Sequence, residues 1–492
     1  MRGAIAAGHP LTAAAGADVL SSGGNAVDAC IAAAFVSWVV ESPLTGPGGG
    51  GFMLVHSARD GRTRLFDFFV AVPGAGERGE PRPMDAVDVL FQGASEEKQV
   101  FHVGAPSVAV PGTLAGLEAA HRSFGSLPWR ELAASAIGHA RDGVELTPEQ
   151  GYLHTILDAI LRRTDEGRAV FGPERGLVAG DRLVQTDLAA TLERVAERGA
   201  AELYDGETGR AVVAHVRAGG GLLTDEDLRA YRVIRRRPVR ASYRDHEFRS
   251  NPPPSSGGVL IAYGLRRLER ERAAFATAPA LAAVAEAMRA QARVRAGAFA
   301  SQLYRGGLAK RLLSGTTHIS VVDANGDAAS LSASLGSGSG VVVPGTGIHL
   351  NNMLGELDLV GATTTPGARL TSMMAPSLVL RGGRTRLVVG SAGSARLRGA
   401  ILQAVANVVD HGLGVREAID APRVHYEEPL LHCEGGHDPR ALDELEALGW
   451  ELVRWRERNL YFGGVSAVEV RDDGSLAAAG DPRRGGAGVV VE

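Results

Sequence analysis

The sequence predicts an α/β protein that is mainly helical up to about residue 313 and rich in β-strand afterwards. Residues 113 to about 230 and 278 to 313 read as helices punctuated by Gly and Pro. After Thr316, short β-branched and apolar runs alternate with turns. The chain has 492 residues, of which 45% are hydrophobic and 22% charged, so it can bury a large core and exceeds one ordinary domain.

Helices and strands alternate in the first hundred residues. The expected elements are a helix Pro10–Leu20 ended by Gly23-Gly24, a helix capped by Asn25 and running to about Val40, and strands Phe52–His56 and Thr63–Phe69. The glycines at 48–51 precede a strand, and no Lys-Ser/Thr pair follows them. We therefore interpret them as a place of close backbone packing and not as a phosphate loop.

The middle of the chain is predicted to be helical. Residues 74 to 100 are charged and read as a loop, and a short strand from Val108 leads into a helix with Thr113 as its cap. Thr224 to Asp227 forms a candidate capping box. The proline-rich loop at 251–258 opens onto another helix.

A β-hairpin is expected directly after Thr316. Ile319, Val321 and Val322 alternate loosely with polar residues, and Asn325-Gly326 is a strong hairpin signal because both residues tolerate positive φ. Pairing back from a two-residue turn places Ser334 opposite Thr317. A second hydroxyl is therefore expected next to Thr316.

A threonine that follows a glycine at the start of a strand permits one specific chemistry. Cleavage of the Gly315–Thr316 bond would give Thr316 both a nucleophilic hydroxyl and a free α-amine, which titrates near ~7.7–8.0 in model compounds. Threonine with its own amine is a recognised nucleophile–base pair. Considered alone, a Thr-Thr pair at a strand start is better explained by ordinary β-propensity than by catalysis.

A turn of small residues, Gly390 to Ser394, links a strand at 387–389 to a helix from about Ala395 to Asp410. Backbone N–H groups at such a helix start can hold an anion or an oxyanion. An ordinary strand-to-helix turn is the alternative. Further strands are expected at 340–345 and 378–380.

Composition excludes several classes of function. The net charge is −4, and no Lys/Arg tract is interleaved with aromatic residues, so nucleic acid is not expected as a partner. Two cysteines and scattered histidines form neither a disulfide framework nor a metal motif, and we expect no metal or cofactor. The longest apolar run, 29–40, is too short to span a membrane. The first residues lack a convincing leader, so we expect a cytoplasmic location.

These stretches together resemble the γ-glutamyltransferase (γ-glutamyltranspeptidase) family of N-terminal-nucleophile hydrolases. The matching motifs lie at 23–29, 48–52, 110–113, 254–258, 316–318, 344–347, 350–353 and 390–393. The resemblance implies a four-layer αββα sandwich that is cut before Thr316 into a large subunit, 1–315, and a small subunit, 316–492. The two fragments would remain together as a heterodimer, and a dimer of such heterodimers is left open.

The resemblance also implies roles for individual residues. Thr316 would be the nucleophile, Gly315–Thr316 the cleaved bond, and Ser334 a hydroxyl partner in place of the family's usual threonine. The backbone N–H groups of Gly393 and Ser394 would form the oxyanion hole, although the family usually has glycine at the second position.

The substrate positions depart from the family pattern. Phe69 replaces the arginine that holds the α-carboxylate of a γ-glutamyl donor, and Met353 replaces a glutamine. Of two serines, Ser372 remains while the second is Met373. Glu356 keeps the family's acidic residue, and the expected asparagine falls at 335 or 336. Loss of a bidentate arginine weakens carboxylate binding, so the γ-glutamyl pocket is expected to be altered.

Three functions follow from these expectations. The first is an autoprocessing threonine hydrolase or acyltransferase that acts on a γ-glutamyl or related amide of a small molecule. The second is C–C bond hydrolysis of a small acidic metabolite by the same threonine, as in relatives from alkylproline biosynthesis. The third is an unprocessed homologue that only binds, which the intact Thr316, Ser334 and Gly393 argue against.

Overall fold

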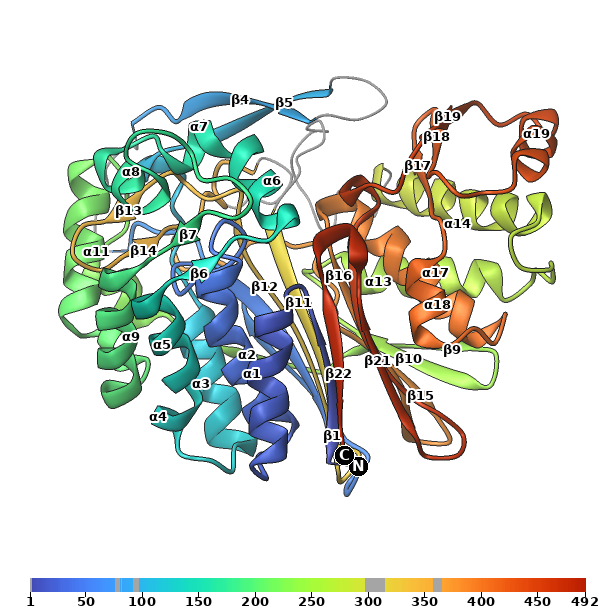
Figure 1. Cartoon of the computed structure of the whole chain (residues 1–492), viewed down its shortest axis with the longest axis horizontal. Helices are drawn as coiled ribbons and strands as arrows, with labels where there is room; N and C mark the ends of the chain where they lie inside the picture. Colours follow the sequence, from blue (N-terminus) through green and yellow to red (C-terminus); the bar gives the residue numbers. More distant parts are fainter. Residues whose placement is uncertain (1, 76–79, 81, 92–96, 297–314, 357–364) are drawn as a thin grey trace.

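Two β-sheets lie face to face between two layers of helices in the computed structural model of the chain (Figure 1). The structure describes all residues except 1, 76–79, 81, 92–96, 297–314 and 357–364. The order helix, sheet, sheet, helix is the four-layer αββα arrangement that the family resemblance implied. Strands β11 and β12 of one sheet contact β16 of the other, so the two sheets pack directly on one another.

The first sheet has seven strands. In spatial order these are β22 (Ala487–Val491), β1 (Gly3–Ala7), β11 (Gly315–Asp323), β12 (Ala328–Gly336), β2 (Gly50–His56), β3 (Thr63–Phe68) and β8 (Ile234–Arg236). All neighbours are antiparallel. The strand that begins with Gly315-Thr316 is therefore a central strand of this sheet.

The second sheet has six strands. In spatial order these are β21 (Leu476–Gly480), β20 (Gly464–Val470), β16 (Arg384–Ala392), β15 (Ser377–Arg381), β10 (His246–Ser250) and β9 (Val239–Tyr243). Its neighbours are also antiparallel. The remaining strands form small ribbons: β4 (Asp85–Phe91) with β5 (Glu97–Val103), β6 (Val144–Glu145) with β7 (Arg182–Leu183), β13 (Val342–Val343) with β14 (Ile348–His349), and β17 (Val424–Glu427) with β18 (Leu430–Cys433) and β19 (Leu452–Arg454).

Helices cover the outer face of each sheet (Figure 1). On the side of the first sheet are α1 (Pro10–Ser21), α2 (Ala26–Val40), α3 (Thr113–Phe124), α4 (Trp129–Leu132), α5 (Ala134–Asp142), α6 (Pro148–Ile156), α7 (Asp158–Leu161), α8 (Asp165–Phe171), α9 (Thr186–Arg198), α10 (Ala201–Tyr204), α11 (Glu207–Ala218) and α12 (Asp225–Ala230). On the other side are α13 (Gly257–Leu268), α14 (Ala278–Ala296), α17 (Leu397–Val409), α18 (Val415–Asp420) and α19 (Pro439–Ala447). Within the described ranges, no helix is long and apolar enough to cross a membrane.

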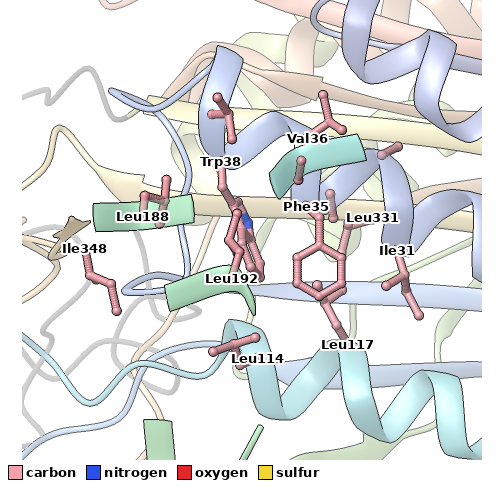
Figure 2. Packing of buried hydrophobic residues seen from close by; sticks show 14 of the residues in the cluster. Ile31, Phe35, Val36, Trp38, Leu114, Leu117, Leu188, Leu192, Leu331 and Ile348 are labelled. Carbon is pink, nitrogen blue, oxygen red and sulfur yellow. The ribbon is translucent and has the colours of Figure 1, made fainter. Parts of the chain in front are cut away.

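Helix α2 is the centre of the first helical layer, and all of its residues are buried. Asn25 caps it by accepting hydrogen bonds from the backbone N–H groups of Val27 and Asp28, and the Asp28 carboxylate accepts from the N–H of Asn25. This capping box starts a helix that is apolar on every face, as a helix enclosed by protein must be. Figure 2 shows Phe35 and Trp38 among side chains of the neighbouring helices and of β12.

Three hydrophobic clusters separate the four layers. One lies between the first sheet and its helices, one between the two sheets, and one between the second sheet and its helices. Because strand side chains alternate between faces, β3 contributes Phe66 and Phe68 to the first cluster and Leu65 to the one between the sheets. Phe69, directly after β3, also lies in the cluster between the sheets.

Some expectations about individual elements were wrong. The region 74–100 contains most of the β4–β5 ribbon, which its charged composition concealed. Helix α3 begins at Thr113, but its cap is Gly112. Val110 forms only an isolated bridge with Ala71 and not a strand. The helix expected at 278–313 is described to Ala296, and 297–313 lie outside the described residues.

Candidate active site

Thr316 is the second residue of β11 and is almost fully buried, with 2% of its surface exposed. Gly315 pairs with Gly336 of β12, and the register shifts between Gly315 and Thr317. Thr316 therefore lies in a β-bulge, a distortion that re-aims a side chain relative to its neighbours. The bond expected to be cleaved is placed at this irregularity.

Ser334 lies next to that bond, although not in the register that the sequence predicted. Thr317 pairs with Ala333 and not with Ser334, because the turn after β11 extends from Asp323 to Asp327. The bulge shifts the register back, and the Ser334 hydroxyl donates a hydrogen bond to the carbonyl oxygen of Gly315. The same Oγ accepts from the N–H of Gly336 at 2.8 Å. A hydroxyl thus holds the carbonyl of the Gly315–Thr316 peptide.

The small-residue turn follows β16 directly and meets the site from the second sheet. Gly393 has φ +119° and Ser394 has φ +54°, so both adopt the left-handed region. Only glycine adopts that region without strain, and a serine there carries a strain of about 1–2 kcal/mol. Ala392, the last residue of β16, lines the same narrow cavity as Thr316. The predicted oxyanion turn is therefore next to the predicted nucleophile.

That cavity is built from both sheets and from the helices above them. Its lining residues are Gly8, Glu41, Leu44, Gln150, Leu153, Thr316, Thr317, His318, Ala392, Gly464, Ser466, Asp481 and Arg484. It reaches Thr316 from the β1–β22 side of β11. Ser334 of β12 lies on the other side.

Glu41 is a buried carboxylate in this cavity that the sequence analysis missed. It accepts hydrogen bonds from the hydroxyls of Thr317 at 2.7 Å and Thr12 at 2.9 Å. Burial raises the pKa of Glu41, although both hydroxyls and the charge of Arg484 oppose this shift. The sequence feature that could have indicated Glu41 is its position directly after a fully apolar helix. The Glu41 carboxylate, directly after α2, therefore holds Thr317 at the start of β11 by a hydrogen bond.

His318 is excluded as a base by its surroundings. Its Nδ1 lies 2.8 Å from Ser332 Oγ, its Nε2 lies 3.0 Å from Ser320 Oγ, and the ring fills the space above Gly390. Burial lowers the pKa of His318 to about 3. The imidazole is therefore neutral near pH 7, with both nitrogens hydrogen-bonded, and it acts as a spacer between the two sheets.

Phe69 and Met353 lie together in the apolar cluster between the sheets. Phe69 is fully buried and stacks on Phe52, with ring centroids 5.5 Å apart. Gly51 pairs with Phe68 and Ser334 pairs with Gly50, so Phe69 and Thr316 lie at the same end of the first sheet. Three strand spacings separate their strands, or roughly 14 Å. In the uncut chain Phe69 is a core residue.

The other predicted substrate residues are divided between two places. A Cβ added to Gly336 would lie 2.6 Å from Glu356 Oε1, so this carboxylate reaches the partner of Gly315. Met373 belongs to the outer cluster of the second sheet and contacts Ser256, while Ser372 accepts the N–H of Ser256 through its carbonyl. The structure brings Glu356 to Gly336, the strand partner of Gly315, but does not place Met373 in the cluster of Phe69 and Met353.

Within the described parts of the chain, no group of three or more His, Cys, Asp or Glu side chains is arranged to hold a metal ion.

The fold is that of the N-terminal-nucleophile hydrolases. A cephalosporin acylase from Bacillus halodurans superposes with a TM-score of 0.84 at 24% identity, covering 100% of this chain and 96% of that one. A γ-glutamyltranspeptidase from Helicobacter pylori has a TM-score of 0.51 at 30% identity and covers 61% of this chain and 83% of its own.

The sequence comparisons identify the family. The sequence model of the family "Gamma-glutamyltranspeptidase" matches residues 12–304 and 297–491. "Acylase ACY 1 proenzyme" of Pseudomonas sp. (strain SE83) is 33% identical, covering 100% of this chain and 94% of the relative. "Glutathione hydrolase proenzyme" of Escherichia coli (strain K12) is 32% identical, covering 98% and 90%. The chain therefore belongs to the γ-glutamyltranspeptidase family and is an enzyme of the N-terminal-nucleophile type.

Proposed function

We propose that the protein is a self-cleaving threonine acylase whose preferred acyl group is not γ-glutamyl. The observation that carries this proposal is the hydrogen bond from Ser334 to the carbonyl of Gly315, at a bulge that contains a buried Thr316. A carbonyl held by a hydroxyl donor next to a hydroxyl nucleophile is the arrangement that peptide-bond cleavage requires.

Cleavage of the Gly315–Thr316 bond would proceed in two steps. Thr316 Oγ attacks the Gly315 carbonyl, the C–N bond breaks, and the acyl group moves from nitrogen to oxygen as an ester. Water then hydrolyses the ester, which releases the Gly315 carboxylate and leaves Thr316 with a free amine and hydroxyl. The large subunit would be 1–315 and the small subunit 316–492.

Turnover of a substrate repeats this chemistry. The amine of Thr316 takes the hydroxyl proton, Oγ attacks the substrate carbonyl, and the N–H groups of Gly393 and Ser394 hold the oxyanion. The proton then passes to the leaving amine, and water or another amine releases the acyl group from Thr316. A neutral His318 with both nitrogens occupied supports the amine as the base.

The choice of acyl group rests on the substituted pocket positions. Phe69 and Met353 pack in an apolar cluster, so neither provides the charge or hydrogen bond that an α-carboxylate needs. A missing guanidinium–carboxylate contact corresponds to about 1.5–3 kcal/mol, or about 10- to 150-fold in the use of γ-glutamyl donors.

Two experiments test this function. Intact-mass measurement should find two chains, the smaller beginning at Thr316, and Thr316→Ala should remain one inactive chain. A single active chain of full length would refute the mechanism. Among 4-nitroanilides, the butyryl compound should be cleaved at least ~10-fold more efficiently than the γ-glutamyl compound, which differs only by its amine and carboxylate. Turnover of glutathione at ~10⁴ M⁻¹s⁻¹ or better would instead restore the usual family activity.

A further inference from the structure

Arg484 is a buried arginine in the cavity of Thr316. Its residue is 8% exposed, and it ends the short 3₁₀ helix η4 (Pro482–Arg484) between β21 and β22. Its side chain makes no hydrogen bond or ion pair to any residue that the structure describes, and its Nε is fully enclosed. A guanidinium carries five donors, and a buried charge is normally paired.

Asp481 and Glu41 favour the charged form of Arg484 from a distance, but neither forms a hydrogen bond with it. Asp481 accepts hydrogen bonds from Arg423 at 2.6 Å and from the N–H of Val465 at 2.9 Å, and its other oxygen binds Arg483. Glu41 is engaged by two threonine hydroxyls. Burial accordingly lowers the pKa of Arg484 to about 10, so it is still a cation near pH 7. The cavity thus contains a guanidinium to which none of the described carboxylates is hydrogen-bonded.

The absence of a side chain at Gly464 leaves room for the side chain of Arg484. A Cβ on Gly464 would lie 2.3 Å from Arg484 Cδ, so the stem of Arg484 runs against the backbone of Gly464. The guanidinium then reaches the oxyanion turn, with one terminal nitrogen 3.7 Å from where a Cβ of Gly393 would lie. The guanidinium of Arg484 therefore ends beside Gly393, a residue of the proposed oxyanion hole.

The side of Thr316 from which Arg484 approaches determines what it can bind. Glu356, Phe69 and Met353, which occupy the positions expected to face the acyl group, lie on the β12–β3 side. Arg484 follows β21 and precedes β22, which pairs with β1 on the other side of β11. An amide bound at Thr316 with its acyl group on the first side directs its leaving amine toward Arg484.

We propose that Arg484 forms a carboxylate-binding subsite for the leaving amine, so that the preferred substrates are N-acyl amino acids, N-acyl peptides or other amides whose amine half is acidic. This inference rests on the proposed threonine acylase function. Bidentate geometry makes a guanidinium well suited to a carboxylate, and a partly dry cavity strengthens the contact.

Arg369, another arginine with a buried side chain, is not a candidate for binding a substrate carboxylate. It lies beside Phe69, but its guanidinium donates to the carbonyls of Phe69 and Arg232 and to the hydroxyl of Tyr231. It is a structural arginine. Arg484 differs because its donors remain available to a substrate.

The test compares two leaving groups on one acyl group. Processed wild-type protein and Arg484→Gln are assayed with the 4-nitroanilide and the 3-carboxy-4-nitroanilide of the acyl group that the wild type cleaves best. Arg484→Gln should lower kcat/KM for the carboxylated substrate by about 10- to 150-fold and leave the neutral one within about threefold. Arg484→Lys should retain part of the preference. Gly464→Ala, whose Cβ displaces the stem of Arg484, should reproduce the loss.

Arg249→Gln is the matched control. Arg249 is also buried, but it binds Glu247 and Thr63 at the opposite end of β3 from Phe68, so its variant should keep the wild-type ratio between the two substrates. Equal loss for both substrates in Arg484→Gln would assign Arg484 to the oxyanion or to the fold, and an unchanged ratio would leave it without a role in binding. Either result overturns the subsite.

A binding measurement separates failure of the subsite from failure of the proposed function. The released amines, 5-amino-2-nitrobenzoate and 4-nitroaniline, are titrated into both proteins by calorimetry. The subsite predicts at least ~10-fold tighter binding of the benzoate to the wild type than to Arg484→Gln, with no difference for the aniline. If the wild type cleaves neither anilide but shows this difference, the acylase function fails while the subsite remains. Equal binding of the benzoate would overturn the subsite.

Discussion

Replacing Ser334 by alanine should slow cleavage of the Gly315–Thr316 bond while leaving the fold intact. The Ser334 hydroxyl donates to the Gly315 carbonyl, whose oxygen becomes negative when Thr316 attacks it. That hydrogen bond strengthens as the charge develops, so its removal acts mainly on the transition state.

The expected magnitude follows from the contacts of this one hydroxyl. Removal of a single oxyanion donor lowers the rate by about 10²- to 10³-fold. The hydroxyl also accepts the N–H of Gly336, so the variant leaves that buried donor unpaired and loses about 1–3 kcal/mol of folding stability as well. The two effects are measured separately, the first as a rate and the second as a shift in denaturation midpoint.

Cleavage is followed on denaturing gels as the fraction of full-length chain against time after a short pulse of synthesis, with intact mass confirming the cut. Ser334→Thr retains a hydroxyl and should cleave within about tenfold of the wild type. Ser332→Ala removes a hydroxyl of the same strand that contacts His318 and not Gly315, and it controls for a general loss of packing. Cleavage of Ser334→Ala within about threefold of the wild type would refute the reasoning.

Three further results are expected. The acidic limb of the kcat/KM–pH profile should follow one ionisation, that of the Thr316 amine, at or below the free-amine range of ~7.7–8.0. An acidic limb near pH 3 would instead assign the base to His318, whose pKa is lowered to about 3. Phe69→Arg places a charge against Phe52 in the inter-sheet cluster, so it should lower the denaturation midpoint strongly, whereas Phe69→Leu lowers it mildly. Equal midpoints of the two variants would contradict the burial of this position. Burial raises the folded-state pKa of Glu41, so its ionisation destabilises the fold as pH rises above about 4.5. The Tm of Glu41→Gln minus the Tm of the wild type should therefore be larger at pH 8 than at pH 5. A Tm difference that does not change with pH would contradict this.

The sequence was informative wherever local chemistry decides structure. The Asn25 cap, the Thr224 capping box and the strand after Gly315 all depend on residues within a few positions of one another, and the structure confirms each of them. The pairing of Thr317 was wrong by one residue, because the turn length and the bulge are set by the packing of neighbouring strands.

The rest of the site could not be read from the sequence because it is assembled across the fold. Glu41 meets Thr317 across 276 positions, and Arg484 reaches the cavity only because β22 pairs with β1. The orientation of Phe69 was equally inaccessible. Its replacement of an arginine was visible, but its burial between two sheets depends on a second layer that no local pattern describes.

The division of both sheets between the earlier and later segments has a consequence for the stability of the enzyme once it is cut as proposed. In the first sheet, β22, β11 and β12 of the later segment alternate with β1, β2, β3 and β8 of the earlier one. In the second sheet, β9 and β10 of the earlier segment lie together at one edge and join the four later strands through β15. Once the chain is cut, refolding requires two separate molecules to find each other, so it becomes dependent on concentration, whereas refolding of the uncut chain does not. If the chain is cut as proposed, heat or denaturant should inactivate the cleaved enzyme irreversibly under conditions from which Thr316→Ala recovers its fold.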